Sequence, residues 1–142
     1  MNMEEKKLPR GIRNNNPLNI RKGNTWKGER TVQTDKSFEQ FISMQYGIRA
    51  GFKLIRNYLT GFNGKTAKFN TIEKLIMRWA PPTENATIKY IDAVESRSAV
   101  NRRTILDFRD KRTMVNIVDA MIWVENGMSV DRQIIESAYD ML

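Results

Sequence analysis

The sequence predicts a mainly α-helical fold of the α+β class, with a small β-hairpin or meander near the N-terminus. From residue 45 onward, apolar residues recur three and four positions apart, as on the buried face of a helix. Residues 11–28 are instead rich in asparagine, glycine and proline, which is typical of turns. A chain of 142 residues is long enough to bury one core. We therefore expect a flexible lead-in over residues 1–10 and a single domain over residues 11–142.

The β element is predicted from alternation in the N-terminal third. Leu18 and Ile20 alternate with polar neighbours, directly after the turn signal at residues 14–17. Residues 31–34 and 38–42 have the composition of two further short strands. Together they favour a hairpin or meander.

The helices follow in order, each with a stop or start signal. The first runs from residue 45 and ends near Gly61. Asn70 and Glu73 resemble a capping box that opens the second, which ends at the Pro-Pro pair of residues 81–82. Thr87 is the expected cap of the third, and Ser129 that of the last, over residues 130–142. Short helical patterns are expected around residues 105–108, and a longer helix over residues 114–125.

The composition excludes several kinds of catalytic and metal site. The chain has no cysteine and no histidine, which excludes disulfides, thiol nucleophiles, Ser-His-Asp triads and zinc sites built on those residues. No carboxylate cluster suggests another metal, so neither a metal nor a cofactor is expected. The net charge of +8 favours an anionic partner such as nucleic acid, anionic lipid or a cell-wall polymer. No apolar run has membrane-spanning length and no secretory signal is evident, so neither a membrane span nor a signal peptide is expected.

Glu125 is the main candidate for a catalytic group. It stands at the end of an apolar helix, beside Trp123, and Asn126-Gly127 follows with residues that stop a helix. Apolar neighbours and the negative end of the helix dipole both disfavour a charged carboxylate. A carboxyl that stays protonated near neutral pH can act as a general acid. The alternative is a solvated helix-end glutamate.

Two stretches carry a family resemblance. Residues 15–23 with Trp26-Lys27-Gly28 resemble the asparagine-rich segment of bacterial and phage glucosaminidases, which belong to the lysozyme-like superfamily. Residues 79–90 hold the place of the segment that lines the sugar cleft in that family. With residues 10–14 in front, the set is also similar to small virion or lysis proteins of tailed phages. The resemblance implies a lysozyme-like helical domain that cuts the glycan strands of peptidoglycan.

The chain departs from the family in one respect. In lysozyme-like enzymes the catalytic glutamate ends a helix upstream of the asparagine-rich segment, whereas only about ten residues precede it here. The helix that ends at Glu125 looks like the missing one. We therefore expect a circularly permuted lysozyme-like fold in which Glu125 returns beside residues 15–20, an arrangement that nearby chain termini permit. The alternative is that the catalytic helix has been lost.

The resemblance to lytic transglycosylases implies a role for each candidate residue. Glu125 would act first as acid and then as base, as the single carboxylate, while the N-acetyl group of the sugar supports the positive centre. Tyr90 would position that group or stabilise charge, unless it belongs to the core. The expected sugar-binding residues are Asn16, Asn19, Trp26 and Asn85. Glu84 is the second choice for the catalytic carboxylate, because it follows the two prolines in an expected loop.

Three functions of different classes remain open at this stage. The first is a phage-associated enzyme that cuts peptidoglycan, as a lysozyme or lytic transglycosylase does. The second is an inert virion structural or cargo protein on the same fold, with other virion proteins as partners. The third, a nucleic-acid-binding protein, rests on charge alone and is not favoured, because no motif supports it. The expected location is the virion, or the host cytoplasm before release.

Overall fold

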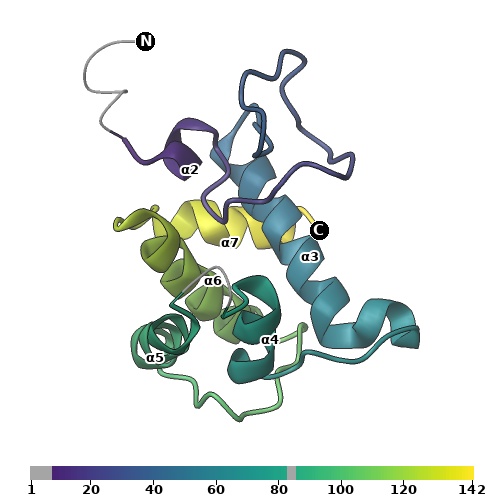
Figure 1. The fold of residues 1–142 in the computed structure, drawn as a ribbon, viewed down its shortest axis with the longest axis vertical. Helices are drawn as coiled ribbons and strands as arrows, with labels where there is room; N and C mark the ends of the chain where they lie inside the picture. Colours follow the sequence, from purple (N-terminus) through teal and green to yellow (C-terminus); the bar gives the residue numbers. More distant parts are fainter. Residues whose placement is uncertain (1–7, 83–85) are drawn as a thin grey trace.

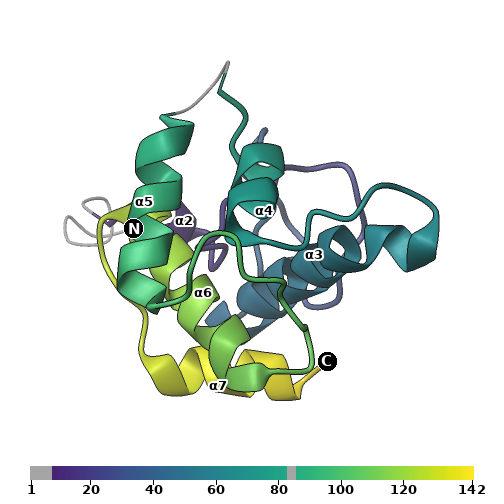
Figure 2. The same ribbon diagram turned by 90° about the horizontal axis from the view of Figure 1, so that it is seen from below.

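The computed structural model describes residues 8–82 and 86–142, and this part of the chain is mainly helical. Its helices are α2 (Arg10–Arg13), α3 (Met44–Gly64), α4 (Ile72–Trp79), α5 (Thr87–Ser98), α6 (Lys111–Asn126) and α7 (Arg132–Asp140). Figure 1 shows α6 in the middle of the helical body, with α5 on one side and α7 on the other. Figure 2 shows α4 beside α5. None of the helices in the described residues is long and apolar enough to cross a membrane.

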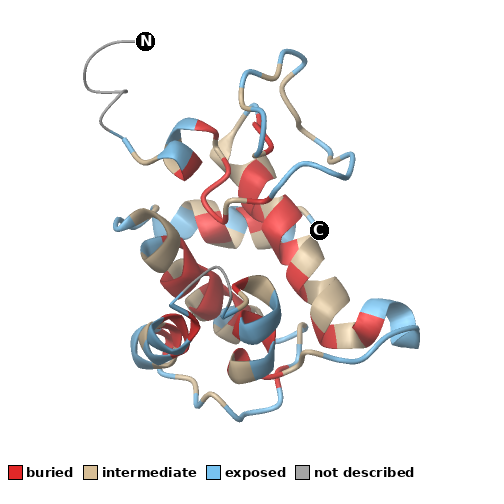
Figure 3. Cartoon of the chain, in the orientation of Figure 1, coloured by how far each residue is buried: buried red, intermediate tan, exposed pale blue. Residues whose placement is uncertain are grey.

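The core follows the apolar stripes that the sequence predicts. Buried side chains of α3, α4, α5, α6 and α7 form one continuous cluster, and Figure 3 shows the buried residues gathered where these helices face one another. Seven residues of α6 are buried, including Ile117, Met121 and Ile122. Burial of a large aliphatic side chain contributes about 1.5–3 kcal/mol, so these residues anchor α6 in the core up to Ile122.

Most helices begin and end near the expected residues, but several of their capping residues differ from the predicted ones. The side chain of Thr71, and not that of Asn70, accepts the N-terminal hydrogen bond of α4. Thr87 is the first residue of α5, and its hydroxyl donates to the carbonyl of Ala80. Asp131, and not Ser129, caps α7. The predicted end of α3 near Gly61 is confirmed, since three residues from there on leave the helical conformation.

The expected N-terminal hairpin does not form. Between residues 14 and 43 the structure contains only two isolated antiparallel bridges, Arg21 with Phe38 and Glu29 with Phe41. The reason is that side chains take the place of strand partners in this segment, as described below for Asn16. The prediction of short helical patterns around residues 105–108 is also wrong, because residues 105–107 are irregular and a turn begins at residue 108.

The boundary of the lead-in needs a correction as well. Residues 1–7 lie outside the described part, but Arg10 belongs to α2 and its guanidinium pairs with both carboxylate oxygens of Asp35, at 2.6 and 2.7 Å. The ordered structure therefore includes Arg10. Figure 1 shows α2 lying close to the C-terminal end of α6, so the start of the described chain contacts the helix that carries Glu125.

Candidate active site around Glu125

Glu125 lies in the last turn of α6, as the sequence predicts. The helix stops at Gly127, which adopts a left-handed conformation with φ of 67° and donates its N–H to the carbonyl of Trp123 at 2.8 Å. The Asn126 side chain donates to the carbonyls of Ile122 and Pro17, at 2.8 and 2.7 Å. Asn126 thus ties the end of α6 to the asparagine-rich segment.

Two polar side chains meet the carboxylate of Glu125. Asn19 Nδ2 donates to Oε1 and the Tyr90 hydroxyl donates to Oε2, both at 2.9 Å. Asn19 comes from the N-terminal segment and Tyr90 from α5. The expected return of Glu125 to residues 15–20 is therefore observed, and a freely solvated helix-end glutamate is excluded.

The environment of Glu125 shifts its titration in the predicted direction. Burial raises the pKa of Glu125 above its ordinary value, while hydrogen bonds from Asn19, Tyr90 and Trp79 oppose the rise. Burial, followed by the charge of Glu125 and the hydrogen bond to it, also raises the pKa of Tyr90, so this phenol stays a donor. Each oxygen of Glu125 has a second lone pair, on which the carboxyl can carry its own proton.

Glu125 stands between two hollows. The hollow on the loop side has a volume of about 480 Å³ and is lined by Leu18, Asn19, Arg21, Phe38, Trp79, Ala80 and Glu125. The hollow on the α5 side has a volume of about 360 Å³ and is lined by Ala86, Lys89, Tyr90, Ala93, Trp123, Val124 and Glu125. Glu125 is the residue that the two linings share, so both hollows reach its side chain.

Asn19 differs from the other asparagines of its segment. Asn15 and Asn19 both have positive φ, 51° and 53°, which asparagine tolerates better than most residues. The side chain of Asn15 donates to the carbonyl of Phe41. Gly47 of α3 lets the segment approach, since a Cβ there would clash with the carbonyl of Asn15. Only the Asn19 amide reaches Glu125.

Asn16 requires a correction as a sugar-binding residue. It is fully buried, its Nδ2 donates to the carbonyls of Ile20 and Glu39, and its Oδ1 accepts from the N–H of Ile20. These bonds use both amide protons, so Asn16 holds the loop and does not face a ligand. They also explain why no strand pairs here.

Trp26 lies away from the two hollows, and its expected sugar-binding role stays a prediction. Its ring packs with Tyr46 against a second small cluster of Ile20, Phe41 and Ala50, and it lines neither hollow beside Glu125. Glu84 and Asn85 lie outside the described residues, so their expected roles stay predictions.

Sequence reasoning missed Arg21, Phe38 and Lys89 in the lining of the two hollows. Arg21 and Phe38 form one of the isolated bridges, and their pairing is not visible in a linear pattern. Lys89 neighbours Tyr90 in the sequence, which is the one signal that could have pointed to it. Among the described residues, no group of three or more acidic, histidine or cysteine residues is arranged to hold a metal.

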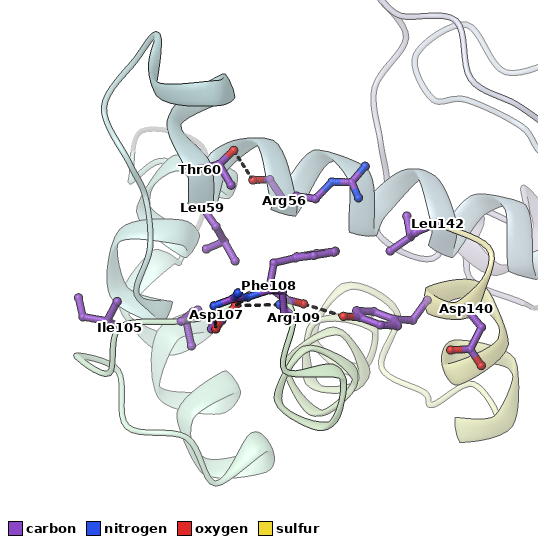
Figure 4. Close-up of a pocket in the computed structure, with 11 residues that line it drawn as sticks. Arg56, Leu59, Thr60, Ile105, Asp107, Phe108, Arg109, Asp140 and Leu142 are labelled. Carbon is purple, nitrogen blue, oxygen red and sulfur yellow. Dashed lines mark hydrogen bonds and ion pairs between the residues drawn. The ribbon is translucent and has the colours of Figure 1, made fainter.

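A larger hollow, of about 810 Å³, lies elsewhere (Figure 4). Its rim carries Arg56, Asp107, Arg109 and Asp140 around an apolar floor. Asp107 pairs with Arg109 at 3.0 Å, and Asp140 pairs with Lys111 at 2.8 Å. Both carboxylates are thus neutralised and exposed, unlike Glu125, so this hollow lacks the acidic group that distinguishes the Glu125 site.

The fold and the site define a mainly helical protein in which a partly buried carboxyl group lines two hollows. No family model matches the chain. It is 38% identical over 122 residues to Protein P5 of Pseudoalteromonas phage PM2, an alignment that covers 83% of this chain and 71% of the relative. The chain therefore belongs to the family of that phage protein.

Proposed function

We propose that this protein cuts the glycan strands of peptidoglycan in the service of a phage, on a circularly permuted lysozyme-like fold. The observation that carries the proposal is the position of Glu125, a partly buried carboxyl group with a raised pKa that lines both hollows and is held by Asn19 and Tyr90. A carboxyl group that lines a hollow, and whose pKa is raised by burial, is a candidate acid catalyst on physical grounds.

In the proposed reaction Glu125 acts twice. It first gives its proton to the glycosidic oxygen as the bond between that oxygen and the anomeric carbon breaks. The carboxylate then accepts a proton from the group that attacks the anomeric carbon, either water or a hydroxyl of the same sugar. Asn19 and Tyr90 donate to the carboxylate and fix its orientation during both steps.

One carboxylate is sufficient only if the substrate assists. Among the described residues, Glu125 is the single acidic side chain that lines the two hollows. A second protein carboxylate would normally support the positive anomeric centre. In this proposal the N-acetyl group of the sugar takes that role.

The test is release of soluble muropeptides from purified peptidoglycan by wild type, Glu125→Gln and Glu136→Gln. Glu136 is a matched control because it is a half-exposed glutamate on α7 that pairs with Arg132 and lines neither hollow beside Glu125. We expect Glu125→Gln to lose about 10²-fold or more of the activity, the range of a general acid, and Glu136→Gln to retain it. Mass spectrometry of the product ends then distinguishes hydrolysis from anhydro-sugar formation.

The second candidate is an inert virion structural or cargo protein on the same fold. Its specific support is the kinship with a phage protein. Folded wild-type protein that releases no muropeptides from the walls of several hosts would favour it over the enzyme.

A further inference from the structure

The charged groups around Glu125 have a consistent sign. Apart from Glu125 itself, the charged side chains among the described residues that line the two hollows are Arg21 on the loop side and Lys89 on the α5 side. Both are cations. Within the described part of the chain, each hollow therefore offers a positive group to a ligand.

Two arginines near the hollows pack on aromatic rings that line them. The guanidinium of Arg21 lies 5.0 Å from the ring centre of Phe38, and that of Arg97 lies 4.0 Å from the ring centre of Trp123. By contrast, Arg102 at the far end of α5 is neutralised by Asp92 and Glu95, at 2.6 and 2.9 Å.

Lys89 is available for a ligand. Its side chain is exposed, and within the described part of the chain its ammonium group makes no ion pair or hydrogen bond. Ala86 and Ala93 stand about one turn before and after it on the same face of α5, and their small side chains leave the hollow open. Trp123 is 38% exposed beside it, and Arg97 packs over the ring and restrains it.

We infer that the α5-side hollow is a subsite for a sugar that bears a carboxylate, with Lys89 as the residue that selects it. The inference rests on the proposed function and names the substrate class of that site. Trp123 offers an apolar surface to the sugar ring, and the Lys89 ammonium pairs with the carboxylate. Peptide-free peptidoglycan glycan, whose lactyl groups end in free carboxylates, is then preferred over a neutral polymer of N-acetylglucosamine.

The preference can be measured as binding, without cleavage. Protein with the Glu125→Gln substitution is titrated calorimetrically with two soluble probes, glycan tetrasaccharides from peptidoglycan stripped of their peptides and neutral chitotetraose. We expect the anionic probe to bind about fivefold more tightly, as one partly hydrated charge pair allows. Adding Lys89→Met should remove this preference and leave chitotetraose affinity unchanged.

Lys65→Met is the matched control, because Lys65 is exposed at the distal end of α3 and lines neither hollow. It should retain the preference. Equal affinity for the two probes, no binding of either, or a preference that survives Lys89→Met would overturn the inference. Wild-type cleavage is assayed separately. A Lys89-dependent preference without cleavage contradicts only the proposed function, and cleavage without the preference contradicts only the inference.

Discussion

Residues 8–43 and residues 44–142 are held together by different forces. In the N-terminal segment Asp35 accepts hydrogen bonds from Arg10, Asn14 and the N–H groups of residues 37 and 38, and Asn16 joins two stretches of loop. The helical body is instead stabilised by one large apolar cluster. Both contribute to the site, Asn19 from the segment and Tyr90 and Glu125 from the body. The site therefore depends both on the hydrogen bonds of the N-terminal segment and on the apolar core of the helical body.

The largest expected effect comes from the apolar side of this comparison. Phe52 is fully buried, with edge-to-face contacts to Phe108 and Tyr139 at 6.3 and 5.4 Å. Phe52→Ala should lower the free energy of unfolding by about 3–5 kcal/mol, because it leaves a cavity in the shared core. Urea denaturation measures this. Val32→Ala, at a side chain that is 74% exposed, is the control and should change stability by less than about 0.5 kcal/mol.

The polar segment should respond locally. Asp35→Asn removes the charge that faces Arg10 and should cost about 2–3 kcal/mol. Amide hydrogen exchange should show lost protection at Ile20 and Phe41, whose N–H groups bond within the segment, and unchanged protection in α6. Asp107→Asn, at an exposed pair, is the control. Equal loss of protection in α6 would contradict the separation of the two regions.

The same substitution predicts a pH dependence. The Arg10 guanidinium, followed by hydrogen bonds from Asn14 and two N–H groups, holds the pKa of Asp35 far below its ordinary value. A carboxyl with a lowered folded-state pKa stabilises the fold above the unfolded pKa of about 4, and this stabilisation is lost as the pH falls below it. Wild type should therefore lose stability on acidification in this window, and Asp35→Asn should lose less.

The smallest expected effect concerns Glu39, whose contribution makes the protein less stable as the pH rises, the reverse of the contribution of Asp35. Burial, followed by the hydrogen bond and charge of Glu29, raises the pKa of Glu39 to about 7. Because the folded state then holds the proton more tightly than the unfolded state, stability falls as the pH rises from about 4.5 to 7. Glu39→Gln should remove this slope and stabilise the protein by about 1–2 kcal/mol at pH 8. Thermal unfolding at pH 5 and pH 8, with Glu136→Gln as control, measures it. Loss of stability at pH 8 would contradict this account.

The difference between the regions also explains how much could be predicted from the sequence. The helical body was predictable, because buried stripes such as that of α6 leave a periodic pattern, and Asn126-Gly127 marks the helix end beside Glu125. The N-terminal segment was not, since the alternation of Leu18 and Ile20 is real but Asn16 provides the hydrogen bonds that a second strand would give.

The residues of the site also differ in how far they could be predicted from the sequence. Glu125, Asn19 and Tyr90 were predicted together, through the family resemblance and the helix-end argument, and the structure joins them. Asn16 was wrong as a ligand-binding residue, because its buried amide holds the loop. The sugar-binding role of Trp26, which packs against a small cluster, stays a prediction. Lys89 was missed, because its importance depends on which face of α5 turns toward Glu125.

The most direct test of the central claim, that Glu125 is the acid of a glycan-cutting enzyme, is the pH profile of muropeptide release by wild type and Tyr90→Phe. The Tyr90 hydroxyl stabilises the charged form of Glu125, so its removal should raise the pKa of Glu125 further. Because the first step needs the protonated acid, the alkaline limb of kcat/KM should move to higher pH in Tyr90→Phe. An alkaline limb that stays in place or moves to lower pH would contradict the assignment of Glu125 as the acid.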